Sequence, residues 1–102
     1  MELNDKQNIT HYLSDQLREF DKKTECIISK GYPINLCCYN GKTHYSGYIE
    51  IEWKYLEPLL DTEKLPQKIV YDIWAGMKSK DPSITMIDAI TIEKLLEILE
   101  SL

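Results

Sequence analysis

The chain has 102 residues, of which 43% are hydrophobic and 28% are charged, so we expect one globular domain over residues 1–102. Twelve basic and seventeen acidic residues give a formal net charge of −5, which disfavours general binding to polyanions and favours a basic partner. The first residues lack a basic region followed by an apolar one, and no apolar run approaches the roughly 18 residues of a membrane span, so we expect neither a signal peptide nor a membrane anchor.

The first element that the sequence predicts is a long helix over residues 5 to about 30. Apolar or small side chains recur there at three- and four-residue steps, at Ile9, Leu13, Leu17, Phe20, Thr24 and Ile27. Gly31 and Pro33 then predict its end. Residues 24–29 also fit a short strand, because a short apolar run is ambiguous by pattern alone.

Residues 33–54 predict a β-hairpin. Asn40 and Gly41 lie between two strand-like runs, and this pair favours a two-residue turn with positive φ at both positions. The turn fixes the register of the facing residues, which are Tyr39 with Lys42, Cys38 with Thr43, Cys37 with His44, and Leu36 with Tyr45.

This register sorts the residues of a continuous hairpin into two faces. The expected core face holds Ile34, Leu36, Cys38, Tyr45, Ile49, Ile51 and Trp53, and the expected polar face holds Asn35, Cys37, Tyr39, His44, Ser46, Tyr48, Glu50, Glu52 and Lys54. We expect the N-terminal helix to cover the core face through Leu13, Leu17 and Phe20. Residues 50–54 lack a partner in this hairpin and need a third strand, a helix or a second chain, which would permit a homodimer through the strand edge.

The C-terminal half is predicted to be helical. Residues 55–66 suggest a helical turn interrupted by Pro58 and then a loop, and residues 67–76 carry an apolar helical stripe. Asp81 and Pro82 favour the start of a last helix that runs to about Ser101, with a break near Asp88–Thr91 because the preceding run is β-branched. The expected fold is therefore α+β, with a long helix packed on a hairpin or small antiparallel sheet and followed by a helical half.

Within residues 66–84, Gly76, Lys78, Lys80, Pro82, Ser83 and Ile84 follow an apolar helix in an order that resembles the latter half of the phage-repressor-like helix-turn-helix family. The resemblance covers about a third of the chain and implies a DNA-binding regulator. The presumed supporting helix departs from the pattern at Pro58, and the presumed reading helix presents Asp72. Two packed helices with a solvated basic turn explain the same residues.

A second alternative is a small magnesium-dependent nuclease. Glu52 and Lys54 match half of the PD-(D/E)xK pattern, in which carboxylates hold the metal. A further carboxylate upstream is required, and only Asp21 or Glu25 is available, both in the predicted helix.

The sequence predicts no metal site, no cofactor and no enzymatic activity. Cys37 and His44 face each other across the hairpin, but Cys37 and Cys38 point to opposite faces of one strand and cannot both bind one ion. There is no nucleophile elbow, phosphate loop or dinucleotide motif. Three cysteines, two of them adjacent, make a poor disulfide framework, so we expect a cytoplasmic protein.

The function that the sequence favours is that of a small acidic binding protein. Five residues of the polar hairpin face, namely Tyr39, His44, Tyr48, Glu50 and Glu52, are the predicted partner-binding site. Tyrosine rings supply buried contact area, and carboxylates steer a basic surface toward the site. Small acidic proteins often oppose basic, nucleic-acid-handling proteins, so the expected role is that of an inhibitor or regulator of such a partner.

Overall fold

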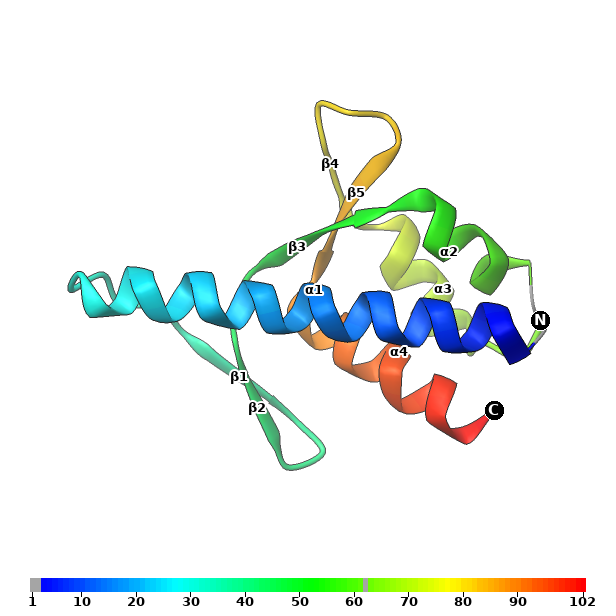
Figure 1. Cartoon of the computed structure of the whole chain (residues 1–102), viewed down its shortest axis with the longest axis horizontal. Coiled ribbons are helices and arrows are strands. Elements are labelled where there is room, and N and C mark those ends of the chain that lie inside the picture. Colours follow the sequence, from blue (N-terminus) through cyan, green and yellow to red (C-terminus); the bar gives the residue numbers. More distant parts are fainter. Residues whose placement is uncertain (1–2, 62) are drawn as a thin grey trace.

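The computed structural model describes residues 3–61 and 63–102 and confirms the α+β class. In chain order the elements are α1 (Leu3–Ser29), β1 (Leu36–Tyr39), β2 (Lys42–Tyr45), β3 (Tyr48–Glu52), α2 (Trp53–Leu60), α3 (Gln67–Trp74), β4 (Met77–Lys78), β5 (Ile84–Asp88) and α4 (Ala89–Ser101) (Figure 1). The strands form two small antiparallel sheets, one of β1 and β2 and one in the order β3-β5-β4.

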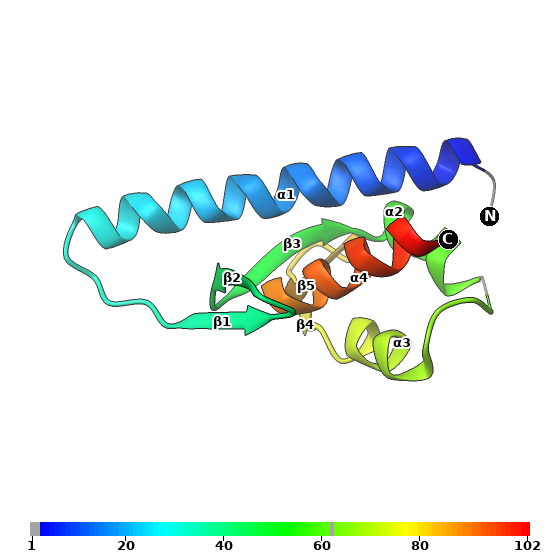
Figure 2. The same cartoon turned by 90° about the horizontal axis from the view of Figure 1, so that it is seen from below.

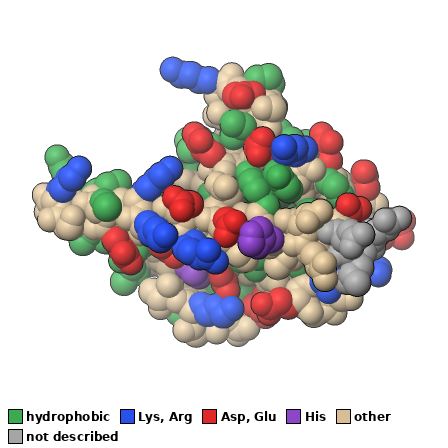
Figure 3. Space-filling view, in the orientation of Figure 1, with side chains coloured by type: hydrophobic (Ala, Val, Ile, Leu, Met, Phe, Trp, Pro, Cys, Tyr) green, Lys and Arg blue, Asp and Glu red, His purple; other side chains and the backbone are tan. Residues whose placement is uncertain are grey.

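Helix α1 lies across one side of the molecule, and its C-terminal turns extend beyond the other elements (Figure 2). Residues 24–29 belong to this helix, so the alternative of a short strand there is wrong. The helix ends at Ser29, and Gly31 beyond it has a φ of 95°, which turns the chain back so that the Tyr32 N–H bonds the carbonyl of Ile27 at 3.4 Å. On the face that α1 presents in Figure 3, acidic and basic side chains are interspersed and form no large patch of one sign.

The register predicted for the first hairpin is confirmed. Leu36 pairs with Tyr45, and Tyr39 pairs with Lys42 next to the turn. Asn40 and Gly41 have φ values of 53° and 81°, as the two central positions of this turn require.

The predicted orientation of the hairpin is wrong, because the chain bends at Ser46 and Gly47 before β3 begins. Leu36, expected in the core, is 63% exposed, whereas His44 from the expected polar face is turned inward. The prediction treated residues 42–54 as one strand, in which alternate side chains stay on one face. The bend resets this alternation, so β3 still buries Ile49 and Ile51.

The helix predicted from Pro82 to Ser101 is also wrong in its first part. Residues Ile84–Asp88 form β5, which pairs with β3 along its whole length and with β4 on its other side. The β-branched residues of this run favour a strand. Helix α4 begins only after Asp88, whose carboxylate accepts the Ile90 N–H at 3.0 Å, near the predicted break. Residues 50–52 therefore have the third strand that the prediction required, and β3 remains an edge strand of this sheet.

Helix α2 runs through Pro58 without the predicted interruption, and position 62 in the predicted loop lies outside the described residues. No helix within the described ranges is long and apolar enough to cross a membrane.

One cluster of buried apolar side chains joins both ends of the chain. The cluster comprises Ile9, Leu13, Leu17, Ile49, Ile51, Leu56, Leu59, Leu65, Ile69, Ile73, Ile87, Ala89, Ile92, Leu95 and Leu99.

Candidate functional site

The structure divides the five predicted partner-binding residues into two groups. Tyr39 and His44 lie on the inward face of the first hairpin, where the Tyr39 ring centroid is 5.4 Å from the Lys94 ammonium on α4. Tyr48, Glu50 and Glu52 lie on the second sheet, at alternate positions of β3 opposite the buried isoleucines. The predicted site is therefore not one continuous face, since the bend before β3 separates its two halves.

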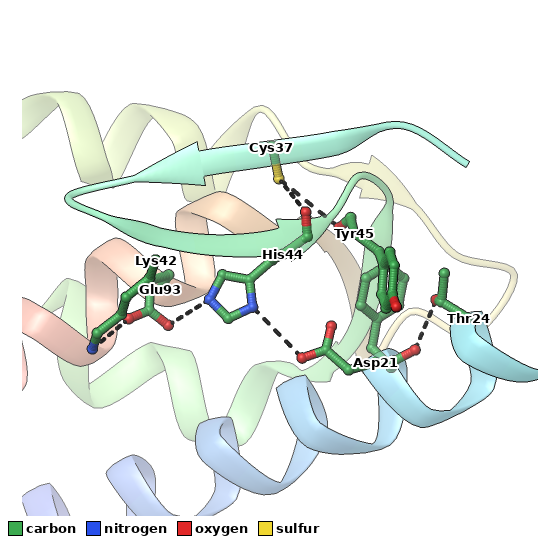
Figure 4. Close-up of polar contacts among 8 residues, drawn as sticks. Asp21, Thr24, Cys37, Lys42, His44, Tyr45 and Glu93 are labelled. Atoms are coloured by element: carbon green, nitrogen blue, oxygen red, sulfur yellow. Dashed lines mark hydrogen bonds and ion pairs between the residues drawn. The ribbon is translucent and has the colours of Figure 1, made fainter. Parts of the chain in front are cut away.

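His44 of this inward group belongs to a cluster of charged side chains from three elements (Figure 4). His44 Nε2 on β2 lies 3.1 Å from Glu93 Oε2 on α4, and the ammonium of Lys42 lies 2.8 Å from Glu93 Oε1. The Glu93 side chain is only 6% exposed, so burial would strongly disfavour its charge without these two partners. Glu93 in turn raises the pKa of Lys42, mainly through their hydrogen bond.

The second nitrogen of His44 faces α1. Nδ1 lies 3.5 Å from Asp21 Oδ2, close enough for charge attraction, although it makes no hydrogen bond within the described residues. The cluster thus attaches the hairpin to α1 and α4 at once.

Cys37 lies beside this cluster and contacts the backbone of the hairpin. The Cys37 thiol points to the carbonyl oxygens of His44 and Tyr45, at 3.4 and 3.9 Å, and burial is the largest cause that raises its pKa. The described residues contain no group of three or more His, Cys, Asp or Glu side chains placed to hold a metal ion.

The carboxylates of the nuclease alternative do not converge. Lys54 lies in α2 rather than at the end of a strand, and its ammonium pairs with Glu52 at 3.8 Å on the surface. The Glu52 N–H donates to the Tyr12 hydroxyl on α1, and Asp21 is nine residues further along that helix, about 13 Å along its axis. Asp21 is instead engaged by His44.

The geometry of the helix-turn-helix alternative is absent as well. The motif requires a second helix after the turn, but residues 84–88 form β5 and residues 77–78 form β4. The basic residues Lys78 and Lys80 therefore lie in and beside a β-hairpin.

The outward group belongs to a larger surface that sequence reasoning missed. We call it the outward sheet face; its members share one side of the β3-β5-β4 sheet and are Tyr48, Glu50, Glu52, Met77, Ile84, Met86 and Asp88. Tyr48 is 46% exposed and Met77 is 49% exposed. The pairing of β5 with β3 and with β4 brings Met77, Ile84, Met86 and Asp88 to this site, and the β-branched residues among 84–87 were the signal that could have indicated it.

Comparison of the chain with protein-family models, curated proteins and solved structures gave no significant match.

Proposed function

We propose that this protein is a non-enzymatic binding protein that docks through its outward sheet face on a basic surface of a partner protein. The observation that carries the proposal is the exposed Tyr48, which lies in one row with Glu50 and Glu52 on β3. Three of the five residues predicted from the sequence are thus retained in the proposed site, and Tyr39 and His44 are assigned to the interior contact of the hairpin.

The apolar part of this face supports a contact that excludes water. Glu50 is paired with Met86, and Met86 is paired with Met77. Two methionine side chains therefore lie across the sheet from Glu50, on the same face as Tyr48. Tyrosine is enriched among the residues that dominate binding energy, and methionine adapts its shape to different partners.

The charges around this centre favour a basic partner. Glu50 and Glu52 lie on β3, and Asp88 lies opposite Tyr48 on β5. A hollow of about 290 Å³ beside Tyr48 and Glu50 is lined in addition by Glu19 and Lys23 of α1. Such a hollow offers a place for a lysine or arginine side chain of the partner, and the carboxylates would raise the association rate.

The class of partner that fits best is a nucleic-acid-handling protein. Its phosphate-binding surface is basic, and a protein with a net charge of −5 is attracted to such a surface. Occupation of that surface would exclude nucleic acid from it, so the expected role is inhibition or regulation.

The experiment starts with affinity capture from the native host and identification of the partner by mass spectrometry. Calorimetry with the purified partner then compares the wild type with the double variant Tyr48→Ala/Glu50→Lys. We expect affinity to fall by a factor of about 30 or more, as for a hot-spot residue combined with a reversed charge.

The matched control is Tyr32→Ala/Glu25→Lys, which makes the same chemical changes at exposed positions near the end of α1. The control should bind as the wild type does, and circular dichroism should show that both variants are folded. Equal affinities of the two variants would refute the proposed site.

A further inference from the structure

A hollow on the other side of the β4–β5 hairpin has a composition unlike the rest of this acidic protein. Its volume is about 390 Å³, within the range of small-molecule sites, and α2, α3 and the loop between β4 and β5 line it. Six of the lining residues matter here: Trp53, Trp74, Lys78, Ser79, Lys80 and Asp81. This hollow shares Ile84 with the outward sheet face, whereas Lys78 and Thr85 line it from the opposite face of the hairpin.

Two indole rings form the apolar wall of the hollow. The ring centroids of Trp53 and Trp74 are 5.3 Å apart, with an angle of 37° between their planes. Trp53 packs against the core, whereas Trp74 is 65% exposed. An exposed indole supported by a second one offers a surface for stacking a flat ring.

The rim of the hollow is basic. Lys78 and Lys80 form no ion pair with any described residue. The Asp81 carboxylate accepts hydrogen bonds from the N–H and hydroxyl of Ser83 at 2.9 and 2.7 Å. These bonds lower the pKa of Asp81, so its negative charge persists and the three side chains sum to one positive charge. Such a rim attracts an anion.

A hydroxyl group completes the polar side. The Asp81 N–H donates to Ser79 Oγ at 3.3 Å, which fixes the position of that oxygen. The hydroxyl hydrogen of Ser79 is donated to no described acceptor, so it is available to a ligand oxygen.

We propose that this hollow binds a nucleoside monophosphate, with the base stacked on Trp74 and the phosphate held by Lys78, Lys80 and Ser79. The indoles supply a stacking surface for the base, and the lysines supply positive charge for the phosphate. The net charge of −5 disfavours a polynucleotide, and it repels a triphosphate more strongly than a monophosphate.

The test is isothermal titration calorimetry with adenosine 5′-monophosphate, adenosine, inorganic phosphate, adenosine 5′-triphosphate and a short single-stranded oligonucleotide. We expect saturable binding of the monophosphate, at least about tenfold tighter than adenosine, phosphate or the triphosphate, because only the monophosphate satisfies both sides of the hollow without added repulsion. Trp74→Ala and Lys78→Gln/Lys80→Gln should each weaken it by a factor of about ten or more.

The matched control is Tyr71→Ala, which removes another exposed ring of α3, one that does not line the hollow. This variant should bind the monophosphate as the wild type does. Absence of saturable binding at millimolar concentration, equal binding by Tyr71→Ala and Trp74→Ala, or tighter binding of the triphosphate would overturn the proposal. Tighter binding of the oligonucleotide would overturn it in favour of a single-stranded nucleic-acid surface.

Discussion

At the scale of single residues, Gly76 shows how closely α3 and β5 approach. A Cβ added at this position would lie 2.7 Å from the carbonyl oxygen of Met86 and 3.1 Å from the side chains of Thr85 and Ile87. Backbone and buried side chains cannot move easily, so only glycine allows the chain to pass from α3 into β4 at this distance.

Ile51 and Leu36 provide the sharpest test of packing at this scale. Ile51 is fully buried in the core, whereas Leu36 is 63% exposed. We expect Ile51→Ala to lower the free energy of unfolding by about 2–5 kcal/mol, because it leaves a cavity. Leu36→Ala, which removes the same number of atoms, should change it by less than about 0.5 kcal/mol. Urea denaturation of both variants measures this difference, and similar losses would show that the hairpin is oriented the other way.

At the scale of elements, the first hairpin is held to the body by polar contacts more than by apolar ones. Its tip is tied to α4 by the bond from the Asn40 amide to Glu97 at 2.9 Å, and its middle by His44 and Lys42 on Glu93. The second sheet contacts α1 through a tyrosine. The Tyr12 hydroxyl accepts the N–H of Glu52 at the end of β3, and the Tyr12 ring stacks on Tyr55 of α2, with 3.7 Å between the ring centroids. Burial is the main cause that raises the pKa of Tyr12, as expected of a ring enclosed between elements.

Glu93→Gln tests the attachment of the hairpin. The variant loses the charge that both basic partners contact, and we expect the free energy of unfolding to fall by about 1.5–3 kcal/mol. Glu100→Gln makes the same change at an exposed position of α4 and should cost less than about 0.5 kcal/mol. In Glu93→Gln, hydrogen exchange measured by NMR should be faster than in the wild type for the amides of β1 and β2, and it should be unchanged for those of β3. An unchanged exchange pattern would mean that the charged cluster does not hold the hairpin.

At the scale of the whole molecule, charge and architecture together disfavour the recognition of duplex DNA. The net charge is −5, and the segment that resembled a repressor motif contains two strands in place of its second helix. No described element presents a basic helix that could enter a major groove, because Lys78 and Lys80 lie in and beside the short β4–β5 hairpin.

We therefore expect no sequence-specific duplex binding at physiological salt. Fluorescence anisotropy with genomic fragments, titrated at several salt concentrations, measures this directly. Submicromolar binding that weakens steeply with salt and is lost in Lys78→Glu/Lys80→Glu would contradict the expectation and restore the regulator alternative.

The sequence by itself determined the elements that depend on neighbours along the chain. The three- and four-residue spacing from Ile9 to Ile27 predicted α1, and Asn40-Gly41 predicted both the turn and the register of β1 with β2. Local rules suffice there because helical contacts and a two-residue turn join residues that are close in sequence.

Only the tertiary structure decided how distant segments pair. The residues after Pro82 had a helix-start signal but form β5. They pair with β3 along the whole strand, and this pairing buries Ile87 in the core. The contact of His44 with Glu93, and the meeting of Tyr48 with Asp88, depend on this arrangement. A bend of two residues at Ser46 and Gly47 set which hairpin face points inward, and no periodic pattern encodes such a bend.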